Sequence, residues 1–200
     1  MTPKVLEAIN QQIANEFGSS FSYLAMAAWC EHHNYTGAGQ WFRLQSSEEH
    51  THAMRLFNFA LARNHQARLA AIEKPTSEFA SLLEVFETAQ TQEQNVSRQI
   101  DALYQLAFEE KVFAAMAELQ WFITEQVEEE KELYFRPFAL SKARTSRVKN
   151  SLICAQLRSR KRLGEGSFSA SSKACLQRFG SDSSKLYRLH STSFCKKTSP

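Results

Sequence analysis

The sequence predicts an all-α fold: an antiparallel four-helix bundle with one long crossover, followed by an irregular basic tail. Three observations predict it. Residues 1–135 contain only two prolines and three glycines, so long helices meet few breaks. Apolar side chains recur at steps of three and four residues in four segments. These segments form two pairs with short internal breaks, and a longer polar link joins the pairs, as in a bundle with one crossover.

The first pair of helices lies before the link. The first helix is expected to follow Pro3 and to carry one apolar stripe, made of Leu6, Ile9, Ile13, Phe17 and Leu24. Residues 34–39 contain two glycines and should separate it from a second helix, whose stripe includes Phe42, Leu56 and Phe59. Apolar periodicity fades over residues 63–74, which predicts the crossover there.

The second pair follows the link. Pro75-Thr76-Ser77 supplies a stop and then an N-cap residue, so a third helix should begin at about Ser77. Its apolar stripe is Phe79, Leu82, Phe86, Val96, Ile100 and Leu103. A weak break at 108–111 leads to a fourth helix with the stripe Met116, Leu119, Ile123 and Leu133. Pro137 is expected to limit that helix.

Charge divides the chain into two expected domains. Residues 1–140 hold 10 basic against 19 acidic residues, whereas residues 141–200 hold 14 against 2. The second part also has 14 serines and weak apolar periodicity, so it should not bury enough surface to fold alone. It is interpreted as a disordered basic arm that contacts nucleic acid, as a solvated extension, or as a non-native end after a frame shift near 136–140.

Location and cysteine chemistry follow from what the sequence lacks. No apolar run approaches the ~20 residues that a membrane-spanning helix needs, and the first residues have no apolar core of signal-peptide length. A cytoplasmic protein is therefore expected. Cys30, Cys154, Cys175 and Cys195 form no CxxC pair, so the sequence indicates neither a zinc site nor a rubredoxin-type iron site.

Polar residues interrupt the apolar stripe of every expected helix. They are Glu16, Glu49 with His52, Glu93, and Gln126. Buried carboxylates are costly unless a cation or metal pairs with them. Glu49 and His52 are three residues apart, so both side chains can reach one metal. An oxygen-rich ligand set with one imidazole suits iron or manganese better than zinc or copper.

These motifs resemble the bacterial non-haem ferritins over about residues 3–135. The matching strings are Asn15-Glu16-Phe17 with Tyr23, Glu48-Glu49-His50-Thr51-His52, Gln92-Glu93-Gln94, and the run from Leu119 to Lys131. A common di-iron bundle pattern has two single glutamates and two Glu-x-x-His motifs. Here the second motif, Glu125-Gln126-Val127-Glu128, has a glutamate where its histidine would stand. That departure is typical of the non-haem ferritins.

The resemblance implies a di-iron ferroxidase centre. Glu16, Glu49 and His52 would bind the first iron. Glu49 would also bridge to a second iron that Glu93 and Glu129 bind.

The resemblance also implies roles for residues around this centre. Gln126 would line it as an amide ligand, Tyr23 would be a redox-active phenol that shares catalysis with the first-iron ligands, and Trp121 would be its aromatic neighbour. A third iron site would share Glu129 and add three carboxylates, Glu48, Glu125 and Glu128.

The function implied by the resemblance is iron storage with ferroxidase activity. Fe(II) would be oxidised by O2 or H2O2, and ferric mineral would be held in a shell of 24 identical subunits. No haem is expected, because haem-binding bacterioferritin repeats Glu-x-x-His and has a methionine where this chain has His50. The alternatives are a rubrerythrin-like di-iron oxidase or peroxidase without mineral, and a DNA-protecting protein that binds through its basic tail.

Overall fold

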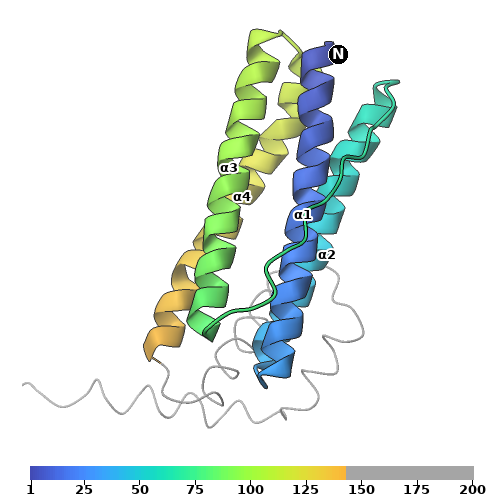
Figure 1. Cartoon of the computed structure of the whole chain (residues 1–200). Helices are drawn as coiled ribbons and strands as arrows, with labels where there is room; N and C mark the ends of the chain where they lie inside the picture. The colour runs from blue at the N-terminus through green and yellow to red at the C-terminus, as the bar shows by residue number, and fades with distance from the viewer. Residues whose placement is uncertain (143–200) are drawn as a thin grey trace, which may run out of the picture. The chain divides into compact units, whose positions relative to one another are not determined.

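The computed structural model describes residues 1–142, with side chains described as far as residue 133. Four helices follow one another: α1 (Pro3–His32), α2 (Thr36–Ala62), α3 (Leu82–Glu109) and α4 (Phe113–Lys142) (Figure 1). The described residues contain no strand, so the all-α prediction is confirmed. None of these helices is both long and apolar enough to span a bilayer. The tail prediction, from Ser141 onward, falls almost entirely outside the described residues.

Local hydrogen bonds fix where the helices begin. Thr2 caps α1, since its Oγ1 accepts from the backbone N–H of Val5 at 3.4 Å, and Pro3 takes the first helical position, where no N–H is needed. Ser81 caps α3 by accepting from the N–H of Glu84 at 3.1 Å. Between α3 and α4, Lys111 adopts a left-handed conformation with φ of 54° that reverses the chain in a few residues.

The crossover is longer than predicted. α1 packs against α2 and α3, and α3 packs against α4. The link between α2 and α3 spans residues 63–81 and runs along α1 (Figure 1). The backbone N–H of Arg68 donates to Asn10 Oδ1 at 3.0 Å there. The predicted helix start at Ser77 is wrong, because Ser81 supplies the cap and Phe79 is still in the link, where it packs edge-on against Trp29.

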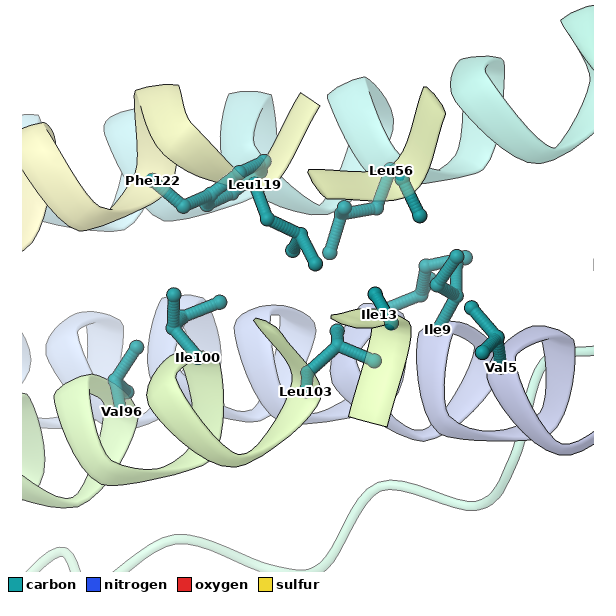
Figure 2. Close-up of a cluster of buried hydrophobic side chains, with 11 residues drawn as sticks. Val5, Ile9, Ile13, Leu56, Val96, Ile100, Leu103, Leu119 and Phe122 are labelled. Atoms are coloured by element: carbon teal, nitrogen blue, oxygen red, sulfur yellow. The ribbon is translucent and has the colours of Figure 1, made fainter. Parts of the chain in front are cut away.

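Apolar residues from all four helices form a core cluster beside the polar residues of the interior. Figure 2 shows side chains from the four helices facing one another across the bundle: Val5, Ile9, Ile13, Leu56, Val96, Ile100, Leu103, Leu119 and Phe122. Each is nearly or fully buried, so the predicted stripes are largely confirmed. They hold the backbones of the helices that carry the interior polar residues in fixed register.

Two predictions about the helices are wrong. Leu24 is 45% exposed because it lies at the edge of the α1 stripe, where Leu6 and Phe17 are only half-buried, and Tyr23 and Met26 are buried instead. Pro137 does not limit α4, which continues to Lys142. A proline inside a helix removes one backbone hydrogen bond and costs about 3 kcal/mol, and here the helix continues despite that cost.

Candidate metal centre

Three predicted ligands meet in the interior. One ligand atom each from Glu16 on α1 and from Glu49 and His52 on α2 lie within 4.8 Å of one another, and all three side chains are buried. Glu49 and His52 are one helical turn apart, which brings His52 Nδ1 to 3.4 Å from Glu49 Oε2. The i, i+3 spacing therefore does what the sequence predicted for this pair.

α3 and α4 supply the other side of the pocket. Glu93, Gln126 and Glu129 are buried there, and the negative charges of Glu93, Glu16 and Glu129 all act on Glu49. Within residues 1–133, no lysine or arginine is buried to balance these carboxylates. The arrangement gathers carboxyl groups from four helices in one place with no buried lysine or arginine among residues 1–133.

Burial and mutual repulsion shift the acidity of these groups. Burial raises the pKa of Glu16, and burial with repulsion from neighbouring carboxylates raises the pKa of Glu49 well above its usual range. Burial also raises the pKa of Glu93 to about 7, although the hydrogen bond from Tyr23 acts in the opposite direction. Without metal, the pocket holds protons that a divalent cation would displace.

Three carboxylates each receive a hydrogen bond on one oxygen. Gln12 Nε2 donates to Glu16 Oε1 at 2.9 Å, and Gln45 Nε2 donates to Glu129 Oε2 at 2.9 Å. The Tyr23 hydroxyl donates to Glu93 Oε1. Burial and the nearby carboxylates raise the pKa of Tyr23 well above its usual value, so the phenol keeps the proton that it donates.

Gln12 and Gln45 donate to these carboxylates, and the sequence analysis did not single them out. Glutamine is common on exposed helix faces, so its presence alone gives little signal. The available signal was position, since Gln12 precedes Glu16 and Gln45 precedes Glu49 by four residues on the same helix face.

Glu16 and Glu49 also carry buried oxygens that lack a donor. No amide, hydroxyl or ring N–H of the described residues donates a hydrogen bond to Oε2 of Glu16 or to either oxygen of Glu49. Buried polar atoms in native proteins nearly always have a partner, so open oxygens at this depth point to a cation. Carboxylate oxygens with one imidazole are a donor set suited to iron or manganese.

The three carboxylates of the predicted third site are differently placed. Glu48 and Glu125 are half-buried, and Glu128 is exposed with its Oε2 3.2 Å from Lys131 Nζ. Within the described part of the chain, Glu16, Glu49 and His52 are the one group of three whose ligand atoms gather. The third site stays a prediction.

Aromatic side chains lie beside the buried polar residues at two places. The Tyr23 ring is stacked on Phe42 with centroids 5.9 Å apart. On the side of α2 and α4, the Trp121 ring lies edge-on to the His52 imidazole with centroids 5.3 Å apart. The Arg55 guanidinium lies over the Trp121 ring, 4.1 Å from its centroid. Trp121 therefore contacts the predicted ligand His52, and the ring neighbours of Tyr23 among the described residues are Phe42 and Trp41 rather than the Trp121 that the resemblance implied.

Comparison with known proteins matches this arrangement to one family. A family model described as a ferritin-like domain matches residues 6–135. The bacterial non-heme ferritins of Staphylococcus aureus (strain USA300) and Staphylococcus saprophyticus are 36% and 37% identical to the chain, each over 130 residues that make up 65% of this chain and 78% of theirs. An open pore ferritin from the archaeon Archaeoglobus fulgidus superimposes with a TM-score of 0.73 at 36% identity, covering 76% of this chain and 95% of its own. The chain therefore belongs to the ferritin family.

Proposed function

We propose that this chain is an iron-storage ferritin that oxidises Fe(II) to Fe(III) at a di-iron centre and deposits the ferric product as mineral. The observation that carries the proposal is the buried gathering of Glu16, Glu49 and His52, with open oxygens and no buried lysine or arginine among the described residues. Glu93, Gln126 and Glu129 face the same pocket from α3 and α4 and would complete a second iron position. Iron is the substrate of this reaction.

The chemistry follows from the ligands. Two ferrous ions would displace the protons of the carboxyl groups whose pKa is raised, and each ion would give one electron to dioxygen. Dioxygen then takes up two electrons and two protons and leaves as hydrogen peroxide. Anionic oxygen ligands stabilise the ferric state, and their moderate affinity lets the product move on to mineral. Glu49, with neither oxygen held by an N–H or hydroxyl donor, is suited to bridge the two ions.

The same proposal assigns the rest of the chain. Residues 1–140 would form the ferritin-like domain and assemble with identical copies into a 24-subunit shell in the cytoplasm, while residues 141–200 would be a separate basic segment. Glu48, Glu125 and Glu128 would hold a third iron on the way inward. The support for the domain is that the family match ends at residue 135.

Iron loading tests storage. The full chain is loaded with Fe(II) in air and passed through gel filtration, and the iron that elutes with the protein is measured. A storage shell should retain far more iron per chain than these ligands could hold. Retention of only two or three ions per chain would contradict storage and favour the rubrerythrin-like oxidase.

Substitution tests the centre. Glu16→Ala and His52→Ala should abolish fast Fe(II) oxidation while far-UV circular dichroism shows that the helices persist. Glu7→Ala on the exposed face of α1 is the matched control and should oxidise iron at the parent rate. If Glu16→Ala and His52→Ala oxidise Fe(II) at the rate of the parent chain, the centre lies elsewhere.

A further inference from the structure

We propose that Gln12 and Gln45 are positioning residues: each holds one oxygen of a carboxylate ligand, so that the carboxylate turns its other oxygen toward the metal. This inference rests on the proposed function. Both side chains are buried, Gln12 at 2% exposure and Gln45 at 0%, and each donates at 2.9 Å to a glutamate of the centre. Neither glutamine is itself a ligand in the assignment above.

The orientation of the Gln12 carboxamide is fixed by a hydrogen-bond chain that leads to the surface. Asn15 Nδ2 donates to Gln12 Oε1 at 3.3 Å and to Gln99 Oε1 on α3 at 3.1 Å. Because the Gln12 oxygen accepts from Asn15, its NH2 group faces Glu16. A flipped carboxamide would place its oxygen against the Glu16 oxygen and lose both hydrogen bonds.

Gln45 holds a carboxylate of another helix. It lies on α2, and its hydrogen bond to Glu129 reaches α4, 84 residues away in the chain. The bond therefore fixes the Glu129 carboxylate relative to the helix that carries Glu49 and His52. Two helices that supply ligands are held in register at the level of the metal.

The neutral carboxamide suits this role. A lysine or arginine in its place would orient the carboxylate equally well but would also neutralise it, and the metal would then bind more weakly. An amide N–H holds the oxygen and leaves the negative charge for the metal. The ligands therefore differ. Glu16 accepts an amide hydrogen bond on one oxygen and has no N–H or hydroxyl donor on the other, whereas neither oxygen of Glu49 has such a donor.

Co2+ binding to the full chain tests the assignment. Co2+ resists oxidation by air at carboxylate sites, and the intensity of its visible absorption reports its coordination number. Gln12→Met and Gln45→Met keep the side-chain length and remove the donor. Loss of such an outer hydrogen bond lowers metal affinity by about 10–100-fold. Gln12→Met should therefore lower the affinity for the first Co2+ ion, and Gln45→Met the affinity for the second. Each variant should also change the absorption band of the ion that it affects. Gln105→Met, on the exposed face of α3, is the control and should match the parent.

A milder variant covers the case in which Gln12→Met fails to fold. Asn15 is half-buried, and Asn15→Ala should free the Gln12 carboxamide to rotate. This variant should lower the affinity for the first Co2+ ion less than Gln12→Met does, and it should leave the affinity for the second ion unchanged. Parent-like affinities and bands in the glutamine variants, or equal weakening of both ions by each variant, would overturn the inference. A parent chain that binds no pair of Co2+ ions would instead overturn the proposed function.

Discussion

Raising the pH of the metal-free protein should lower its free energy of unfolding, because Glu93 keeps its proton in the folded state. Burial raises the pKa of this carboxyl from 4.5 to about 7. The unfolded chain loses the proton near its ordinary pKa, whereas the folded chain holds it until the higher value. The stabilisation is therefore complete below the lower pKa and is lost as the pH rises through the upper one.

The size of the effect follows from the shift. Each pKa unit corresponds to roughly 1.4 kcal/mol, so the change from 4.5 to about 7 predicts a loss of about 3 kcal/mol across this pH range. The pKa values of Glu16 and Glu49 are raised as well and act in the same direction. A loss of this size is a large part of the stability of a typical domain.

Urea unfolding of the chelator-treated chain at about pH 5 and about pH 8 measures the loss directly. Glu93→Gln replaces the carboxyl with a neutral group of the same shape, so this variant should lose less stability over the same range. Glu87→Gln, on the exposed face of α3, should behave like the parent. Equal stability at the two pH values, or a rise with pH, would refute the reasoning that burial keeps the carboxyl protonated.

Two further predictions concern single side chains. Tyr23→Phe removes the donor to Glu93, so it should destabilise the metal-free chain by about 1–3 kcal/mol at about pH 8. The loss should be smaller at about pH 5, where the carboxyl is protonated. A loss of stability in urea unfolding that is the same at both pH values would contradict this. Leu56→Ala should cost about 2–5 kcal/mol in the same assay because Leu56 is fully buried, whereas Leu61→Ala on the same helix, at 49% exposure, should change stability by less than about 0.5 kcal/mol.

The sequence pattern predicts the parts of this structure that depend on local periodicity. Glu16 follows Ile13 at a helical step, and both prove buried. Leu24 lies about 100° around α1 from the buried Tyr23, on the edge of the helix where Phe17 is only half-buried, and it is exposed. The predicted start of α3 at Ser77 is wrong because residue type alone does not separate Ser77 from Ser81. Glu84 follows Ser81 by three residues, and its carboxylate accepts from the backbone N–H of Ala80, a pattern typical of a helix start.

Contacts between distant helices lie beyond what the pattern can predict. The hydrogen bonds from Gln45 to Glu129 and from Asn15 to Gln99 each join residues 84 positions apart. Such a bond depends on the rotation and register of two packed helices, which periodicity does not fix. The sequence could therefore indicate which carboxylates face inward but not which amides hold them.

The order of the helices has a consequence for how the centre is made. Glu16, Glu49 and His52 all lie on α1 and α2, within the first 62 residues. A chain synthesised from its N-terminus releases this hairpin from the ribosome before the link and before α3. The three gathered ligands thus belong to the half of the bundle that is synthesised first. The half that carries Glu93 and Glu129 is synthesised later and packs against them.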